Sequence, residues 1–345
     1  SGLTLSVALM CAGSLLIGVT PGYETIGVAA PMLLVLARLM QGLSIGGEYG
    51  ASATYLSEMA GRNRRGFFSS FQYVTLIAGQ LVAICVLLIL QASLTVEQLD
   101  AWGWRIPFFI GGALAIIVFW LRRGLSETQS FANAKAEGAP KSGFVELITR
   151  HPRETMTVMM LTAGGTIAFY AYSIYMQKFL VNTSGLTREA ASQINAVTLF
   201  LFMLLQPVAG AVSDRIGRKP LMISFGVLGV ICTYPIFSTL AQTTDPMVAG
   251  LLVMAGLLIV TGYTSINAVV KAELFPAHIR ALGVALPYAL ANTLFGGTAE
   301  FVALWFKQAG MEEAFYIYVS IMIAISLAVY VCMRDTAKHS QILED

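Results

Sequence analysis

Charged residues are scarce in this sequence, and their scarcity indicates the class of protein. Only 12% of the 345 residues are Asp, Glu, Lys or Arg, whereas soluble domains carry about 25%. Apolar residues make up 57% of the chain, and the mean hydropathy is +0.73. Because a globule of this size would still expose a large surface, the chain could not cover itself with polar side chains in water. The composition therefore predicts a protein surrounded mainly by lipid.

Several functional classes lack the residues that they need. The four cysteines lie far apart inside apolar runs, which argues against a disulfide framework and against a metal cluster. The net charge of +2 excludes nucleic-acid binding as the main function, because phosphate neutralisation needs massed Lys and Arg. No Gly-x-x-x-x-Gly-Lys-Ser/Thr loop occurs, which excludes an ATP-driven pump. We expect no cofactor and no enzymatic activity, with a membrane enzyme or sensor as the weakest alternative.

Long apolar runs are what the sequence has in abundance. Ten runs have about the length of 20 residues that a helix needs to cross a bilayer. Backbone groups in hydrocarbon must bond internally, so the runs are predicted to be helices, and the short alternating strands of a membrane barrel are absent from the sequence. The predicted spans are Leu3–Thr20, Val28–Ser52, Phe68–Leu90, Ile106–Leu121, Met156–Leu180, Ala191–Ala211, Leu221–Leu240, Met247–Val270, Ala281–Phe306 and Ala314–Met333.

The basic residues are distributed unevenly between the two sides of these spans. If the loop Pro21–Gly27 is external, 16 of the 21 Lys and Arg lie in loops on the opposite side, and only three lie in external loops. Cytoplasmic loops carry an excess of Lys and Arg. The asymmetry predicts that both ends of this chain lie in the cytoplasm.

An internal repeat relates two parts of the chain. Glu58 and Arg65 are seven residues apart, Glu273 and Arg280 have the same spacing, and the pairs are offset by 215 residues. Two parallel repeats of six helices are a known transporter plan. On that plan the first two helices have no counterpart here, and a natural ten-span protein is the alternative. The predicted division is an incomplete N-terminal bundle at 1–121, a cytoplasmic loop at 122–155, a C-terminal bundle at 156–333 and a cytoplasmic tail at 334–345.

Two arginines are the main candidates for binding an anion. Arg38 lies about 15 Å along its predicted span, close to the bilayer midplane, and Gln41 projects from the same face. A cation at that depth faces an aqueous cavity or a polar partner, so Arg38 either binds substrate or bonds to neighbouring helices. Arg105 follows Trp102 and Trp104 at the outer start of a span. It either anchors the aromatic belt or reaches inward to grip a carboxylate.

Other polar residues at membrane depth complete the candidate site. Glu48 is a candidate proton carrier or a partner of loop arginines, and Glu300 either attracts protons or forms a salt bridge. Arg38 is assigned to proton coupling together with these two acids. Lys271 and Glu273 end a span on the inner side and are predicted to form a cytoplasmic gate pair. The same gate is predicted to include Glu58, Arg65, Asp214, Arg218 and Arg280. The predicted substrate-binding residues besides the two arginines and Gln41 are Tyr73, Gln80, Tyr170, Tyr263, Asn267 and Asn292.

Several motifs resemble the major facilitator superfamily. The short turn Asp214–Lys219 resembles its charged loop signature, and Arg38-x-x-Gln41-Gly42 resembles a fourth-helix motif of its proton-coupled members. Further segments are similar to the metabolite:proton symporter branch, and within it to the alpha-ketoglutarate permeases. These segments are Pro21–Gly27, Gln41–Gly50, Ser70–Tyr73, Gly103–Pro107, Tyr175–Asn182 and Lys271–Pro276.

The resemblance implies a fold of two six-helix bundles that bind substrate between them. It also implies a monomer in a bacterial inner membrane that takes up a dicarboxylate, first of all 2-oxoglutarate, with protons as the coupling ion. A related symporter of proline or betaine, citrate or shikimate is the alternative. The expected partners are a small anionic metabolite, protons and the lipid bilayer.

Overall fold

The structure is a computed structural model that describes residues 2–122 and 143–342. The chain divides into two compact units, each described here by itself. Unit 1 comprises residues 1–51 and 82–127, and unit 2 comprises residues 52–81 and 128–345. The boundary between them passes through two long helices, α3 (Ala29–Glu58) and α4 (Arg65–Ser93). The four-part division predicted from the sequence stays a prediction, and residues 123–142 of its central loop lie outside the described residues.

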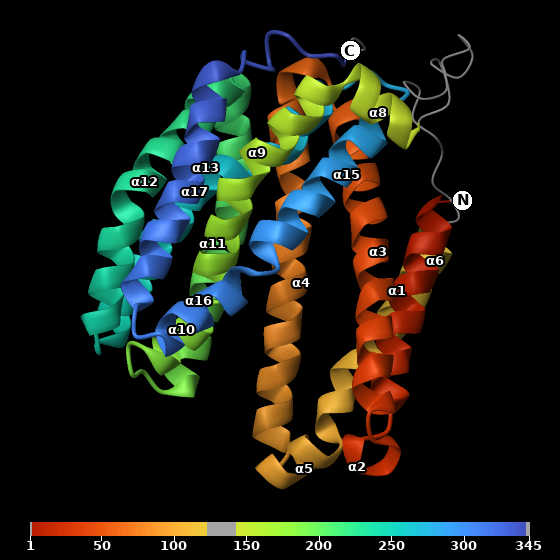
Figure 1. Ribbon diagram of the computed structural model, residues 1–345, viewed down its shortest axis with the longest axis vertical. Helices are drawn as coiled ribbons and strands as arrows, with labels where there is room; N and C mark the ends of the chain where they lie inside the picture. The colour runs from red at the N-terminus through yellow and green to blue at the C-terminus, as the bar shows by residue number, and fades with distance from the viewer. Residues whose placement is uncertain (1, 123–142, 343–345) are drawn as a thin grey trace. The chain divides into compact units, whose positions relative to one another are not determined.

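Unit 1 is built around the pairing of its first and last helices. Beside its parts of α3 and α4, it contains α1 (Gly2–Val19), α2 (Tyr23–Ile26), α5 (Val96–Ala101), the 3₁₀ turn η2 (Gly103–Arg105) and α6 (Ile106–Arg122). Helix α1 packs along α6, as Figure 1 shows. Gly18 and Gly112 allow the close approach: a methyl group on Gly112 would overlap Leu15, and one on Gly18 would press on Phe109.

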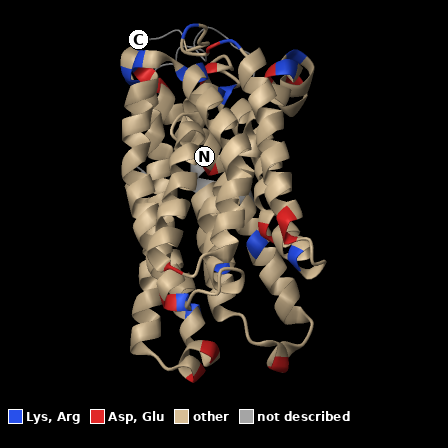
Figure 2. Cartoon of the chain, turned by 90° about the vertical axis from the view of Figure 1, so that its left-hand side faces the viewer, with Lys and Arg blue, Asp and Glu red and all other residues tan. Residues whose placement is uncertain are grey.

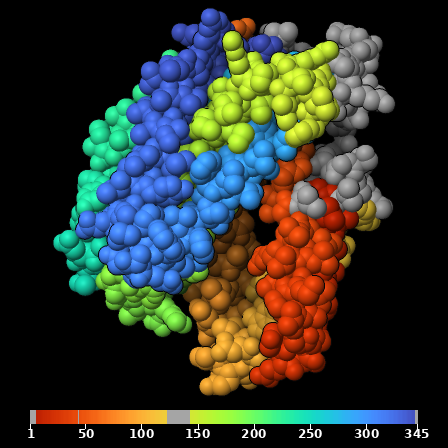
Figure 3. Space-filling view, viewed as in Figure 1, coloured from red at the N-terminus to blue at the C-terminus, as the bar shows by residue number. Residues whose placement is uncertain are grey.

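Unit 2 contains most of the chain. Beside its parts of α3 and α4, its elements are η1 (Arg62–Arg64), α8 (Phe144–Arg150), α9 (Pro152–Phe169), η3 (Tyr170–Ile174), α10 (Met176–Asn182), α11 (Arg188–Ile216), α12 (Arg218–Gln242), α13 (Pro246–Thr264), α14 (Asn267–Glu273), α15 (Arg280–Ala291), η4 (Asn292–Gly296), α16 (Ala299–Gln308) and α17 (Glu312–Cys332). Helix α9 packs against α15 and α17, as Figures 1 and 3 show, and α12 packs against α13 and α17.

Aromatic rings fill one end of the core of unit 2. Phe237 of α12 stacks on Tyr316 of α17 with 5.2 Å between ring centroids, and it meets Phe179 of α10 edge-on at 5.2 Å. The outer faces are apolar instead of polar: Ile231 and Leu251 expose 64% and 65% of their surface. Large exposed apolar faces are expected where lipid is the solvent.

The described residues fold only into helices and their connections, so the predicted all-α class is confirmed. Among these residues, eight helices are long and apolar enough to span a membrane. The first predicted span is the shorter apolar helix Ser6–Val19, and the ninth is divided into α15, η4 and α16. Each of the ten predicted runs thus coincides with helix, whereas their count as ten membrane spans stays a prediction.

Gly217 makes the turn between α11 and α12, and it provides a test of the fold. Its φ of +94° is costly for any residue with a Cβ, and an added methyl group would also overlap the Asp335 carboxylate. We expect Gly217→Ala to destabilise the protein by more than the roughly 1–3 kcal/mol that this glycine-specific backbone conformation alone costs. Thermal unfolding of the purified protein in detergent measures the loss.

Gly185→Ala is the matched control for this substitution. Gly185 also has positive φ, +74°, but an added methyl group would meet open space. An equal loss of stability in the two variants would contradict the packing of Asp335 against the turn.

Candidate functional site

Three of the predicted binding residues lie where helices of unit 2 are interrupted. Tyr170 begins the π-helical segment η3, Asn292 begins the π-helical segment η4, and Asn267 begins α14 after a break at residues 265–266. Single π-helical turns inside α-helices are frequent at functional sites. Interrupted helices also turn polar groups toward the protein interior at membrane depth. The interruptions therefore indicate where unit 2 could receive a polar ligand.

Polar contacts join these interruptions to one another. The Asn292 Oδ1 atom accepts a hydrogen bond of 2.6 Å from the Thr166 hydroxyl, and its Nδ2 atom donates one of 3.3 Å to the Tyr170 hydroxyl. Tyr73 of α4 is buried, meets Phe169 edge-on at 5.3 Å and lies against Asn267. The structure thus brings five predicted residues into one region of unit 2, here called the polar cluster: Tyr73, Tyr170, Tyr263, Asn267 and Asn292.

Lys271 also lies in the polar cluster, where the sequence did not place it. Its side chain is fully buried, and its ammonium donates a hydrogen bond of 2.8 Å to the Asn267 Oδ1 atom. The ammonium lies 4.3 Å from the ring centroid of Tyr288 and 5.8 Å from that of Tyr263. The carboxylate of Glu273, its predicted gate partner, instead lies 3.7 Å from the Arg218 guanidinium.

Sequence reasoning missed Tyr288 and the environment of Lys271. Asn267 and Lys271 are four residues apart, so they share a helix face, and this spacing was the available signal. Tyr288, on α15, carried no distinguishing signal among the 13 tyrosines. Gln80, another predicted binding residue, is half-buried, and its side-chain oxygen has no hydrogen-bond partner among the described residues.

Arg38 heads a chain of polar side chains in unit 1. Its guanidinium donates a hydrogen bond of 3.1 Å to the Gln41 Oε1 atom, and Gln41 in turn donates one of 3.0 Å to the Ser14 hydroxyl of α1. The guanidinium lies 6.0 Å from the ring centroid of Phe108. The Arg38 side chain is exposed, so in a membrane it needs water or an anion as a further partner.

Arg105 has a different environment. Its guanidinium donates hydrogen bonds of 2.9 and 2.7 Å to the carbonyl oxygens of Gly18 and Thr20, and it lies 4.6 Å from the ring centroid of Trp104. Carbonyl groups at the end of α1 have no partner within the helix, and a cation there is favourable. These contacts fasten the end of α1 to the start of α6.

The two candidate proton carriers belong to different units, Glu48 to unit 1 and Glu300 to unit 2. Glu300 forms an ion pair with Lys178, one of the two outcomes that the sequence left open. Glu48 is half-buried in the part of α3 that belongs to unit 1.

A charge cluster lies at helix ends of unit 2, and Figure 2 shows Lys, Arg, Asp and Glu gathered at the ends of the helices. Asp214 accepts hydrogen bonds of 2.8 and 2.9 Å from the backbone N–H groups of Gly66 and Phe67, at the N-terminus of α4. Its carboxylate also lies 2.8 Å from the Arg218 guanidinium. Asp214 therefore fastens α11 to the start of α4, where a negative charge complements the helix dipole.

An ion pair in this charge cluster joins the two sequence repeats. Arg280, from the second repeat, forms an ion pair with Glu58 of the first, and both side chains are buried. The tail joins them: Arg280 and Arg65 donate hydrogen bonds of 3.0 and 3.2 Å to the carbonyl oxygens of Gln341 and Ile342. All the predicted gate residues except Lys271 meet in this cluster, which also holds the backbone of the tail.

Comparisons with known proteins agree with this architecture. The model of the Major Facilitator Superfamily matches residues 2–297 and 179–344. The alpha-ketoglutarate permease of Escherichia coli is 51% identical over 97% of this chain and 77% of that relative. The citrate-proton symporter of Salmonella typhi is 34% identical over 86% of this chain and 68% of that relative. This chain belongs to the major facilitator superfamily.

The solved structures extend the comparison to the fold. A proton:xylose symporter of the superfamily superposes with a TM-score of 0.79 over 99% of this chain and 81% of that one, at 17% identity. The family model and the relative that is 51% identical confirm the family resemblance found in the sequence. The relatives are permeases and symporters, so the chain is a transporter in class and not an enzyme.

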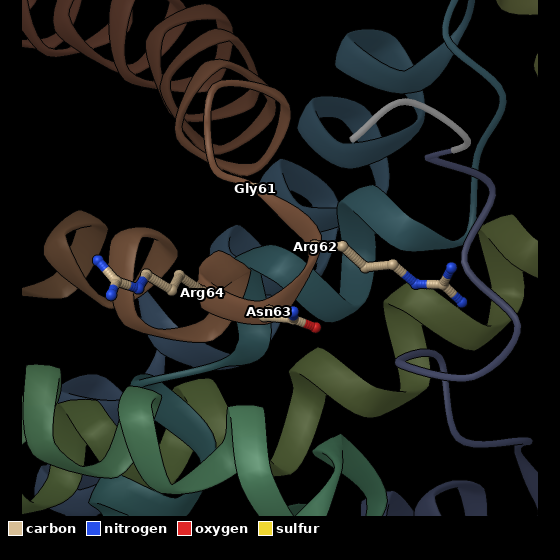
Figure 4. Close-up of a pocket in the computed structure, with 4 residues that line it drawn as sticks. All are labelled: Gly61, Arg62, Asn63 and Arg64. Atoms are coloured by element: carbon tan, nitrogen blue, oxygen red, sulfur yellow. The ribbon is translucent and has the colours of Figure 1, made fainter.

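Two arginines line a hollow on the surface of unit 2. Gly61, Arg62, Asn63 and Arg64 of the loop at η1 surround about 590 Å³. Figure 4 shows Arg62 and Arg64 pointing in opposite directions. Because guanidinium groups that diverge cannot hold one carboxylate together, we assign no binding role to this hollow.

The buried pair Arg280–Glu58 gives a test of the charge cluster. Their side chains are 1% and 3% exposed, so removing one charge leaves the other buried and uncompensated. We expect Arg280→Gln to lower the free energy of unfolding by about 3 kcal/mol or more. Denaturant titration of the purified transporter measures this change.

Arg150→Gln serves as the control for loss of a guanidinium. Arg150 lies 3.9 Å from Glu146, but its side chain is 71% exposed. Exposed pairs contribute about 0–1 kcal/mol. Comparable losses in both variants would refute a special contribution from the buried pair.

Proposed function

We propose that this transporter takes up 2-oxoglutarate together with protons, by alternating access across a bacterial inner membrane. The observation that carries the proposal is the 51% identity to a relative named alpha-ketoglutarate permease, over nearly the whole chain. A superfamily fold alone admits many cargoes, so identity at this level is the stronger guide to the substrate.

The chemistry of the candidate residues supports an anionic cargo. A dianion enters a low-dielectric site only where cations compensate it, and the exposed guanidinium of Arg38 lies on a predicted membrane span. Moving a charge against the membrane potential costs about 2.3 kcal/mol per 100 mV. Co-transported protons offset the charge of the anion and make uptake favourable.

Each predicted residue takes a role in this proposal. Arg38 and Gln41 are the candidate anion-binding residues of unit 1, and the polar cluster and Gln80 are the candidates of unit 2. Arg105 fastens α1 to α6 through carbonyl groups, and we assign it to positioning as well as to attraction of the anion. Glu48 and Glu300 are the candidate proton carriers, with Glu300 held by Lys178.

The charge cluster is proposed to be the cytoplasmic gate. Its ion pairs join parts of both sequence repeats and the tail, so they stabilise a closed cytoplasmic side and must separate when the substrate leaves. The excess of basic residues on this side favours cytoplasmic ends for the chain. We propose that the transporter acts as a monomer and needs no cofactor besides the coupling protons.

A second candidate function is the symport of another small solute. The relatives also include citrate-proton symporters at 34% and 33% identity and a proline/betaine transporter at 30%. Citrate would need more positive charge than 2-oxoglutarate, whereas a zwitterion would need an anionic partner such as Glu48.

Uptake by the purified protein in proteoliposomes tests the proposal. We expect labelled 2-oxoglutarate to accumulate when the outside is acidic and to leak out when a protonophore is added. A gradient of one pH unit supplies about 1.4 kcal/mol per proton, enough for about tenfold accumulation. Uptake that ignores the pH gradient, or that citrate or proline abolishes at much lower concentration than 2-oxoglutarate, would overturn it.

The role of Arg38 is tested in the same system. We expect Arg38→Ala to reduce uptake to background while the protein still inserts and unfolds at the normal temperature, because the anion loses its cation in unit 1. Arg188→Ala removes an exposed arginine at the start of α11 and should leave uptake unchanged. Normal uptake by Arg38→Ala would remove this residue from the mechanism.

A further inference from the structure

A groove on the surface of unit 2 lies between α12 and α17, which pack side by side (Figure 1). Its volume is about 380 Å³, and its walls are the side chains of Val230, Tyr234, Ile317, Ser320, Ile321 and Ala324. The four wall residues of α17 have the spacing i, i+3, i+4 and i+7, so they form one stripe along that helix. Ser320 and Ala324 have small side chains, which leaves room along the stripe.

The walls of this groove, here called the α12–α17 groove, suit a hydrocarbon chain. Both helices are long and apolar enough to span a membrane. Ile317 and Ile321 expose 49% and 54% of their surface. The Ser320 hydroxyl donates a hydrogen bond of 3.0 Å to the Tyr316 carbonyl oxygen, so its hydrogen is already used within the helix. Lipid is the solvent of such a face.

A carboxylate lies at one end of the stripe. Glu313 precedes Ile317 by four residues, so it lies on the same helix face, and its side chain is exposed. The Tyr234 hydroxyl, from the opposite wall, donates a hydrogen bond of 2.8 Å to the Glu313 Oε2 atom. The neighbouring Glu312 has a cation partner in Lys307, at 3.4 Å, whereas the partner of Glu313 among the described residues is this neutral hydroxyl.

The length of the stripe matches one leaflet of a bilayer. Eleven residues separate Glu313 from Ala324, which amounts to about 16 Å along the helix. The hydrocarbon core of a bilayer is about 30 Å thick, so one leaflet contributes about 15 Å. A phospholipid with its headgroup at Glu313 therefore has room for an acyl chain along the whole stripe.

The charge of Glu313 selects among headgroups. A carboxylate repels the anionic headgroups and attracts those that carry an ammonium. A primary ammonium donates hydrogen bonds to a carboxylate, and such charge-assisted bonds are about twice as strong as neutral ones. A quaternary ammonium has no N–H group to donate. The complementary headgroup is therefore ethanolamine.

We propose that the α12–α17 groove binds one molecule of phosphatidylethanolamine, with its ammonium on Glu313 and one acyl chain along the stripe from Ile317 to Ala324. Tyr234 positions the carboxylate for this contact. The inference goes beyond the proposed function and holds for any cargo, since it concerns only the surface of unit 2. The competing occupant of the same face is a second copy of this chain.

Native mass spectrometry of the purified protein tests the proposal with two lipids that share their acyl chains, dioleoyl phosphatidylethanolamine and dioleoyl phosphatidylcholine. We expect the wild type to bind the ethanolamine lipid about fivefold more tightly than the choline lipid. Glu313→Gln keeps the shape of the side chain but removes its charge, and we expect it to bind the two lipids equally.

Two control variants separate the headgroup contact from the groove. Glu189→Gln removes another exposed acid, at the start of α11, and should keep the preference of the wild type. Ala324→Leu fills the far end of the groove, so it should weaken both lipids at least threefold and leave their ratio unchanged. Thermal unfolding confirms that each variant is folded.

Loss of the preference in Glu313→Gln together with its survival in Glu189→Gln supports the proposal. Equal binding of the two lipids by the wild type, or a preference that survives Glu313→Gln, would overturn it. Unchanged lipid binding by Ala324→Leu would place the lipid elsewhere. A dimer that dissociates in Ala324→Leu would show that a second copy of the chain covers this face. Uptake is not measured here, so failure of the proposed function would leave these results untouched.

Discussion

This structure depends on one physical constraint. A charge that is buried away from water must be compensated by an opposite charge or by polar groups of the protein. On a surface exposed to water, most ion pairs would contribute little to the free energy of unfolding. In the interior of unit 2, however, Arg280 and Arg218 each lie beside a carboxylate, and the tail supplies further carbonyl oxygens to Arg280 and Arg65. The same constraint explains why Asp214 lies at the start of α4, since exposed N–H groups of that helix also need an acceptor.

Hydropathy and length were enough to predict the helices, because a helix in lipid must be long, apolar and internally hydrogen-bonded. They were not enough to predict the interruptions at Tyr170 and Asn292. Neither interruption contains a proline, and side-chain contacts such as the hydrogen bond between Thr166 and Asn292 join residues far apart in the sequence. Hydropathy carries no information on such contacts.

The sequence predicted which residues belong to the candidate site better than it predicted which of them form pairs. The seven-residue spacing identified Glu58, Arg65, Glu273 and Arg280, but spacing along the chain carries no information on which repeat supplies the partner, and Arg280 pairs with Glu58. Lys271 and Glu273 were assigned together because both lie at the inner end of one predicted span. Two residues apart on a helix, their side chains point in directions about 200° apart. One therefore meets the polar cluster and the other meets Arg218.

The contrast between the arginines of the charge cluster and Lys271 bears on how a transporter can bind a substrate tightly and still release it. Arg218 and Arg280 have carboxylate partners of the protein itself, so an arriving anion would have to displace a full negative charge. The neighbours of Lys271 include an amide oxygen and two ring faces, and neutral groups of this kind attract a cation less strongly than a carboxylate does. Groups that hold a charge strongly are suited to closing a gate, and groups that hold it weakly are suited to a site that must fill and empty in every cycle. The groups around the arginines of the charge cluster therefore differ in kind from those around Lys271, within one unit.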